Sequence, residues 1–182
     1  MSELHPQHWI TTTIGEVTVD VVQREPEKDE SFIYIDISSI NRETKSISDP
    51  KQMLGQHAPS RARKVVQAGD VLVSMTRPNL NAVAMVPEEL DGQIASTGFD
   101  ILRAIGIDSR WLFYLVQTID FVQSMSELVQ GVLYPAIRSR DVRAFEIPLA
   151  PSNEQKRIAD KLDVLLVRVN ACRAFCNPSI AI

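Results

Sequence analysis

The feature that most constrains the fold of this chain is a pair of prolines followed at once by a long helical pattern. Pro148 and Pro151 lie in the segment IPLAP at residues 147–151, where each proline fixes its own φ angle and disfavours helix in the preceding residue. Beyond Ser152, apolar residues recur at alternating spacings of four and three, which is typical of a seam between two helices. The seam consists of Ile158, Leu162, Leu165, Val169, Cys172 and Cys176. The chain is therefore expected to leave a compact body at a stiff joint and to continue as a helix.

This helix is predicted to span residues 152–176, which corresponds to a length of roughly 37 Å. Ser152 and Gln155 have the spacing of a capping box, and Glu154 suits the positive end of the helix dipole. Asn177-Pro178 is predicted to end the helix. Because the seam is narrow, a partner helix fits it better than a broad β surface does. The two cysteines of the seam are expected to be small apolar residues, since a zinc site needs about four ligands.

The residues before the joint predict an α+β fold with a mainly β body and one packed amphipathic helix. Asp108 or Ser109 is expected to cap that helix, which runs from about 109 to 129 and ends at Gly131. The polar stretch from Ser38 to Lys64 is predicted to be a long functional loop. Short β-branched or apolar runs bounded by turn residues predict strands at 31–37, 69–75, 81–86, 91–96, 98–104 and 146–150. The predicted domains are 1–151, a spacer helix at 152–176, and a tail at 177–182.

Composition and charge restrict the classes of function. The chain is 45% hydrophobic and has a net charge of −4, so it is globular and is not a general coat for nucleic acid or membranes. It shows neither a secretory signal nor a membrane span, which makes the cytoplasm the expected compartment. Charge is unevenly distributed, because residues 16–49 hold nine acidic and four basic side chains whereas 51–77 hold five basic and one acidic. This asymmetry is compatible with one basic surface on an acidic protein.

No catalytic motif stands out in the sequence. Phosphate-binding loops, dinucleotide fingerprints and nucleophile elbows are all missing from the 182 residues, and the three histidines are isolated. Asp36 followed by Glu43 and Lys45 has a weak likeness to a metal-dependent nuclease, but such a site needs carboxylates on adjacent strands, and here they fall in a polar stretch. We therefore expect no enzyme activity, no bound metal and no cofactor on this chain.

The remaining polar residues have the chemistry of DNA recognition. Arginine pairs with guanine and asparagine or glutamine with adenine in the major groove, whereas lysine, serine and threonine contact phosphates. The predicted DNA face combines the loop at 51–64, the segment TRPNLN at 76–81 and the region of Ser96-Thr97, with two arginines near residue 140 as phosphate contacts. The predicted DNA-binding residues are Lys51, His57, Ser60, Arg61, Arg63, Lys64, Arg77, Asn79, Asn81, Ser96, Thr97, Arg138 and Arg140.

An ordered set of segments resembles a known family. The segments are IGEV at 14–17, FIYIDISSI at 32–40, APSRARKVVQAGDVLVSMTRPNLNAVAMVP at 58–87, QIASTGFDILR at 93–103, GVLYPAIRSRDV at 131–142 and IPLAPSNEQKRIADKLDVLL at 147–166. Together they resemble the specificity subunits of type I restriction-modification systems over nearly the whole chain. The step from IPLAP through Glu154 and Gln155 into a helix is the most recognisable part.

The resemblance implies a non-catalytic target recognition domain that reads one half of a split sequence in double-stranded DNA. In this family two such domains lie in tandem, and their long helices pack antiparallel as a spacer. The helices dock modification subunits, which bind S-adenosylmethionine and methylate adenine, and restriction subunits add cleavage that depends on ATP and Mg²⁺. These cofactors are thus expected on partner subunits. The implied partners are DNA, modification and restriction subunits, and either a second copy of the chain or another specificity chain.

The sequence departs from the family pattern in two ways. It holds one recognition domain, so it resembles half of a specificity subunit, and its helix is predicted to end early at Asn177-Pro178. A natural half-subunit, a truncated gene and a cloned fragment all remain open. Two other functions also remain open: a module that binds modification subunits without DNA, and a small metal nuclease.

Overall fold

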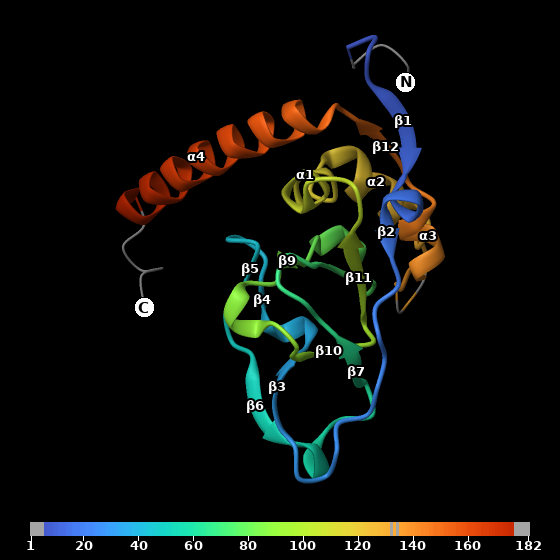
Figure 1. Ribbon diagram of the computed structural model, residues 1–182, viewed down its shortest axis with the longest axis vertical. Coiled ribbons are helices and arrows are strands. Elements are labelled where there is room, and N and C mark those ends of the chain that lie inside the picture. The colour runs from blue at the N-terminus through green and yellow to red at the C-terminus, as the bar shows by residue number, and fades with distance from the viewer. Residues whose placement is uncertain (1–5, 132, 134, 177–182) are drawn as a thin grey trace.

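A β-rich body and a long helix that projects from it make up this computed structural model (Figure 1). The structure describes residues 6–131, 133 and 135–176, with side chains up to Cys172 at the C-terminal end. The α+β class and the long C-terminal helix predicted from the sequence are confirmed. Within the described ranges, no helix has the length and apolar character needed to cross a membrane.

Two four-stranded sheets form the body. In the first, antiparallel strands follow the order β2-β11-β8-β9. In the second the order is β6-β3-β10-β7, and the β10–β3 pair is parallel. Their bounds are β2 Thr18–Val19, β11 Phe99–Ala104, β8 Val71–Ser74, β9 Val83–Met85, β6 Lys51–Leu54, β3 Ser31–Ile35, β10 Ile94–Ser96 and β7 Ala62–Val65. All six predicted strand segments contain a strand, five of them in these sheets, although most strands are shorter than predicted.

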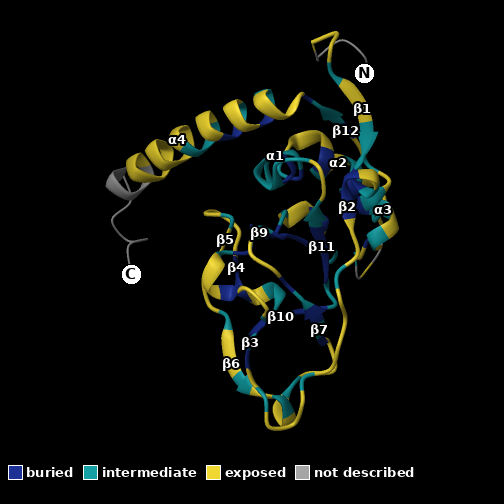
Figure 2. Ribbon diagram, in the orientation of Figure 1, coloured by how far each residue is buried: buried dark blue, intermediate teal, exposed yellow. Residues whose placement is uncertain are grey.

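The first sheet is covered on both faces, which explains why β8 is continuously buried. Val71 and Val73 point into a core shared with the helices, whereas Leu72 points into a core that contains residues of the second sheet. A strand buried on both sides needs apolar residues at successive positions, so it reads as an unbroken apolar run. The body is thus layered as helices, first sheet and second sheet, as the dark strands in Figure 2 indicate.

Two helices cover the outer face of the first sheet where one was predicted. Helix α1 spans Ser109–Leu115 and α2 spans Ile119–Glu127. Asp108 caps α1 as expected, because its side chain accepts a hydrogen bond from Arg110 N. Thr118, which fits the apolar spacing of a single helix, instead caps α2 by accepting from Phe121 N. The prediction of one helix to Gly131 was wrong because a capping residue occupies a position in the apolar pattern.

The predicted loop at 38–64 contains short strands. A hairpin of β4 (Ile40–Asn41) and β5 (Ser46–Ile47) comes first, followed by β6 and β7. Strand β6 pairs only with β3 in its sheet, so it is an edge strand with mostly exposed side chains. The loop prediction was wrong because β4 and β5 are too short to give a periodic pattern, while β6 and β7 pair with strands outside the stretch. Short 3₁₀ helices connect the elements: η1 Ile14–Val17, η2 Ile37–Ser39, η3 Gly55–His57, η4 Pro78–Leu80 and η5 Glu88–Leu90.

The two ends of the body meet in a separate pair of strands. Strand β1 (Ile10–Thr13) pairs antiparallel with β12 (Glu146–Leu149), next to the small helix α3 (Ser139–Arg143). Helix α4 (Ser152–Cys176) follows β12 directly and extends beyond the body, where most of its surface is exposed (Figure 2). The predicted helix stop at Asn177-Pro178 and the predicted tail lie outside the described residues.

An ion pair connects β11 of the first sheet to the loop that precedes β8. The guanidinium of Arg103 on β11 donates to both oxygens of Asp70, at 2.9 and 2.8 Å, and Asp70 is 2% exposed. Removal of one partner from such a pair leaves an uncompensated buried charge.

We predict that Arg103→Met lowers the free energy of unfolding by about 3 kcal/mol, because the Asp70 carboxylate then stays buried without its cation. Urea denaturation followed by circular dichroism measures this change. Arg24→Met is the matched control, since Arg24 pairs with Glu30 at the surface and should cost less than about 1 kcal/mol. Equal losses in the two variants would contradict the assignment.

Candidate nucleic-acid interface

Four segments that are far apart in the sequence lie side by side along one side of the body. Thr97 N donates to Arg61 O at 2.9 Å, and Met75 N donates to Gly98 O at 2.9 Å. Ile137 N donates to Met75 O at 2.8 Å, and Arg77 N donates to Pro135 O at 2.9 Å. Continuous backbone pairing thus joins the turn before β7, the turn between β10 and β11, the end of β8 and the segment before α3.

Exposed basic and amide side chains belong to these segments. Arg61, Arg77, Asn79, Arg138 and Arg140 are all exposed. Among the residues that the structure describes, none of Arg61, Arg77 and Arg138 forms an ion pair with a carboxylate, so their charges are available to an anionic partner. Arg140 has one contact at the long distance of 3.6 Å, with its neighbour Asp141. We call this set of five residues the basic face.

The loop TRPNLN contributes two members of the basic face and has an unusual backbone. Arg77 and Asn81, which flank η4, both adopt left-handed conformations with φ values of 49° and 43°. Pro78 occupies the first position of η4, as its fixed φ favours. The side chain of Asn81 is bonded inside the protein, since Lys45 Nζ donates to its Oδ1 at 2.8 Å and its Nδ2 donates to Val116 O at 2.9 Å. Asn81 therefore supports the loop and does not extend from it.

Two further residues of the predicted DNA set are buried. Lys64 is 9% exposed, and its Nζ donates to Phe99 O at 2.7 Å, 4.0 Å from Asp100. Burial lowers the pKa of Lys64. Ser96 is 3% exposed, and its Oγ accepts a hydrogen bond from Gly98 N. The prediction that these two residues face DNA does not fit their positions, because groups bonded inside the fold cannot reach a DNA backbone without opening it.

The other predicted residues are distributed around the basic face. Ser60 is exposed beside Arg61, and Thr97 is partly exposed. Arg63 is half-buried and pairs with Glu25 at 2.9 Å, which leaves its charge partly neutralised. Lys51 and His57 are exposed in β6 and η3. Lys51 is not part of the cluster, because β6 and β7 are opposite edges of a four-stranded sheet and lie roughly 14 Å apart.

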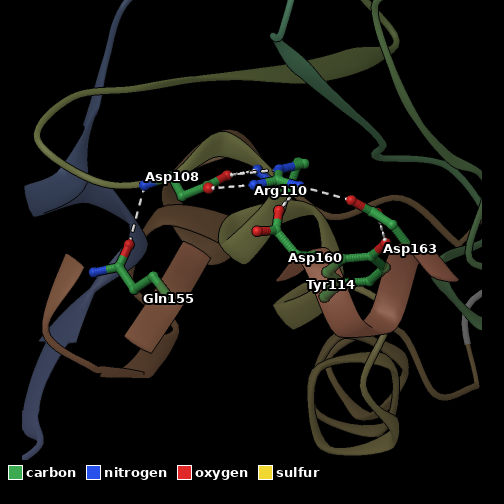
Figure 3. Close-up of polar contacts among 6 residues, drawn as sticks. All are labelled: Asp108, Arg110, Tyr114, Gln155, Asp160 and Asp163. Atoms are coloured by element: carbon green, nitrogen blue, oxygen red, sulfur yellow. Dashed lines mark hydrogen bonds and ion pairs between the residues drawn. The ribbon is translucent and has the colours of Figure 1, made fainter. Parts of the chain in front are cut away.

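A polar junction connects α4 to α1 (Figure 3). The guanidinium of Arg110 contacts Asp108 at 2.9 Å and both Asp160 and Asp163 of α4 at 2.7 Å. Tyr114 donates its hydroxyl to Asp163. The hydrogen bond with Asp108, followed by that with Asp160, raises the pKa of Arg110 above its ordinary value. Burial, followed by the bond to Asp163, raises the pKa of Tyr114, so Arg110 stays charged and Tyr114 stays protonated at neutral pH.

Gln155 is the buried centre of this junction and has a different role from the one predicted. It is 2% exposed, accepts from Asp108 N through Oε1 at 3.0 Å and donates to Ala150 O through Nε2 at 2.7 Å. The predicted capping box with Ser152 was wrong because the Gln155 amide is bonded to other groups, while Pro151 O accepts from Glu154 N and Gln155 N. The same sequence spacing fits both roles, so the sequence could not distinguish between them.

The N-terminal segment supports the proline joint. Glu154 accepts hydrogen bonds from His8 Nε2 at 2.8 Å and Trp9 Nε1 at 3.0 Å, which lower its pKa in that order. Trp9 packs edge-on against Trp111 at a centroid distance of 5.4 Å, and Trp111 Nε1 donates to Pro148 O at 3.2 Å. The joint therefore has a defined direction.

The predicted seam of α4 is divided by its position along the helix. Ile158 and Leu162 are half-buried near the body, whereas Leu165, Val169 and Cys172 are exposed beyond it, and the side chain of Cys176 lies outside the described part. Three exposed apolar neighbours, Val164, Leu166 and Val167, were not part of the prediction. The apolar surface is therefore broader than a strict seam. Among the described residues, no three His, Cys, Asp or Glu side chains are grouped so that they could hold a metal ion.

Fold and surface together define a β-rich domain with exposed arginines on one side and a projecting helix that presents apolar side chains. The chain belongs to the family described as type I restriction modification DNA specificity domain, which it matches over residues 6–171. Membership in this family gives the chain a role in DNA sequence recognition.

Solved structures and a curated relative agree with this membership. The chain superposes on the HsdS subunit of Thermoanaerobacter tengcongensis with a TM-score of 0.87 and 40% identity, covering 93% of this chain and 45% of that one. A chain from a type I restriction-modification structure, described by its complex assembly and conformational transition, gives 0.86 and 41%, again covering 93% of this chain and 45% of that one. The MjaVIII specificity subunit of Methanocaldococcus jannaschii is 28% identical over 103 residues, which are 54% of this chain and 24% of that protein. The chain thus spans less than half the length of these relatives.

We predict that Gln155→Leu loosens α4 from the body, because Asp108 N and Ala150 O lose their buried partner at a cost of about 1–3 kcal/mol each. Hydrogen exchange should accelerate at residues 152–163 and remain slow in β8 and β11. Gln123→Leu is the matched control, since Gln123 lies on the exposed surface of α2. Unchanged exchange in α4 of the Gln155 variant would show that the amide does not hold the helix.

Proposed function

We propose that this chain reads one half of a split DNA site and directs partner methyltransferase and restriction subunits to it. The observation that supports this proposal best is the convergence of four distant segments on one side, where they carry Arg61, Arg77, Asn79, Arg138 and Arg140 in exposed positions. Arginine and asparagine side chains suit guanine and adenine edges, and the arginines beside α3 suit phosphates. Chemistry on DNA is assigned to the partners, which would hold S-adenosylmethionine, ATP and Mg²⁺.

Helix α4 is the proposed connection to these partners. Its exposed Val164, Leu165, Leu166, Val167 and Val169 form an apolar surface that extends beyond the body. A second helix that covers this surface would join two recognition domains, each contacting its own half-site. The occupant is either a second copy of this chain or another specificity chain.

Charges beside the seam favour another chain. When Ile158, Leu162, Leu165 and Val169 are taken as the a and d positions, Lys161 and Arg168 both fall at g, and Ala159 and Leu166 at e. Lys161 and Arg168 are exposed, and neither flank between 158 and 172 carries a carboxylate. In a pair of identical helices, therefore, no flanking carboxylate faces Lys161 or Arg168. A different helix with acidic residues at its flanks would provide such carboxylates. Flanking charges of this kind select the partner of a coiled coil.

A second candidate is a module that binds modification subunits without reading DNA. The apolar surface of α4 favours it, because that surface exists independently of the basic face. Capture of modification subunits together with no binding to any duplex would support this alternative over the first.

We predict that Arg61→Ala and Arg77→Ala each weaken sequence-specific binding of duplex DNA by about 1–3 kcal/mol, because each removes a base or phosphate contact. A duplex selected from a random pool by the wild-type chain serves as ligand, and fluorescence anisotropy measures its affinity. Arg157→Ala on α4 is the control, since it removes the same charge from an exposed position outside both the basic face and the flanks of the seam. If neither face variant loses at least roughly 1 kcal/mol, the assigned face is wrong.

We predict that the doubly reversed variant Lys161→Glu/Arg168→Glu associates with the wild-type chain about tenfold more tightly than either protein associates with itself. The physical reason is that only the mixture places carboxylates against cations. Sedimentation equilibrium of the two proteins alone and mixed, at low and high salt, measures this difference. A wild-type dimer as tight as the mixture would favour the second-copy arrangement, and monomers throughout would argue against pairing through this seam.

A further inference from the structure

Three residues with positive φ other than glycine stand together around one loop. Within the described part of the chain, only Lys45, Arg77 and Asn81 have this conformation, with φ values of 55°, 49° and 43°. A left-handed conformation costs free energy in residues that have a Cβ atom, so it persists where the surroundings enforce it. Arg77 and Asn81 flank the turn η4, and Lys45 reaches that turn from the hairpin β4–β5. Two of the three positive φ values therefore flank the loop at 77–80, and the third lies in the hairpin turn from which Lys45 contacts that loop.

Hydrogen bonds between Lys45, Asn81 and Val116 connect the loop to two other elements. Lys45 Nζ donates to Asn81 O at 2.6 Å and to Asn81 Oδ1 at 2.8 Å. Asn81 Nδ2 then donates to Val116 O at 2.9 Å. Val116 is fully buried at the C-cap of α1, where backbone carbonyls lack partners inside the helix. Asn81 thus satisfies a buried carbonyl while its own carbonyl and amide oxygens hold the lysine.

Lys45 is an uncommon choice for a purely structural contact. It is half-buried, and burial lowers its pKa, with repulsion from Arg42 as a smaller cause. No carboxylate pairs with it among the described residues, so its charge is balanced only by hydrogen bonds. Burial of a cation in this way is unfavourable, and it needs a compensating gain. The two hydrogen bonds to Asn81 compensate for this burial and connect Lys45 to the loop that carries Arg77 and Asn79.

The tips of the loop remain exposed although its base is fixed. Arg77 and Asn79 are exposed members of the basic face, and Leu80 is 37% exposed. Side chains that a protein holds in their binding geometry lose less conformational entropy when the partner arrives. Helix α1 also carries Arg110 and Tyr114, which contact α4. The loop and the projecting helix are therefore both bonded to α1 or to its C-cap.

We propose that Lys45 and Asn81 are positioning residues for DNA sequence recognition: they preset the loop at 77–80, so that Arg77 and Asn79 meet the base edges, while neither contacts a base itself. This inference rests on the proposed function, because it assumes that the basic face meets DNA. It changes the predicted role of Asn81 from reader to support, and it assigns a role to Lys45, which was predicted only as part of a weak nuclease motif.

The test compares Lys45→Met and Asn81→Ala with the wild-type chain on two duplexes. One duplex is selected from a random pool by the wild-type chain, and the other is its scrambled form. We expect the preference for the selected duplex to fall about tenfold in each variant, while affinity for the scrambled duplex and the salt dependence of binding stay unchanged. Arg42→Met is the matched control, since it removes one positive charge from the same hairpin turn without touching Asn81.

Other outcomes overturn the inference. If Lys45→Met weakens binding to both duplexes equally and lowers the salt slope by about one, Lys45 is a phosphate contact. If the preference stays at the wild-type value, Lys45 and Asn81 do not position the loop. Lys45→Met leaves the bond from Asn81 to Val116 in place, so it remains informative if Asn81→Ala melts early. Failure of the proposed function is recognised separately, because Arg61→Ala and Arg77→Ala would then also leave binding unchanged.

Discussion

The position of α4 relative to the body depends on the hydrogen bonds and ion pairs formed by Gln155 and Arg110. Most of α4 lies beyond the body, and polar contacts from α1 hold its first turns (Figure 3). One buried amide satisfies Asp108 N and Ala150 O, and one guanidinium connects three carboxylates, one at the N-cap of α1 and two on α4. Because these groups are polar and directional, they set an orientation that apolar packing alone would leave loosely defined.

Helix α1 contacts both α4 and the loop at 77–81. Arg110 and Tyr114 on α1 contact α4. At the C-cap of α1, the Val116 carbonyl accepts a hydrogen bond from Asn81 of the loop at 77–81. The break at Thr118 keeps α1 short, so its two ends lie near the two regions. In the proposed function, sequence recognition and attachment to partners thereby share α1 as a common element.

The sequence predicts most strongly those parts whose structure depends on local pattern. The apolar run of β8 and the helix α4 follow directly from periodicity, and the strands between residues 69 and 104 follow from turn residues. Strands β4 and β5 were missed because each is only two residues long, and β6 was missed because its polar residues are ordered by pairing with β3, outside the polar stretch. Arg61, Arg77 and Asn79 were placed on an exposed face, whereas Lys64, Ser96 and Asn81 turned out to be bonded inside it. Residue type indicates which groups suit DNA, but burial, which depends on the whole fold, decides which of them can reach it.

The pairing of β1 with β12 has a consequence for the order in which the protein is assembled. Ile10 lies opposite Leu149, and β3 pairs in parallel with β10 across an interval of about sixty residues. Contacts so distant along the chain fold slowly, because the entropy of closing a long loop must be lost before the contacts form. During synthesis the first strand has no partner until residue 149 has left the ribosome. The pairing of β1 with β12 therefore forms only after Pro148 has been synthesised. Helix α4 follows within a few residues, so it emerges as the last strand pair of the body can form.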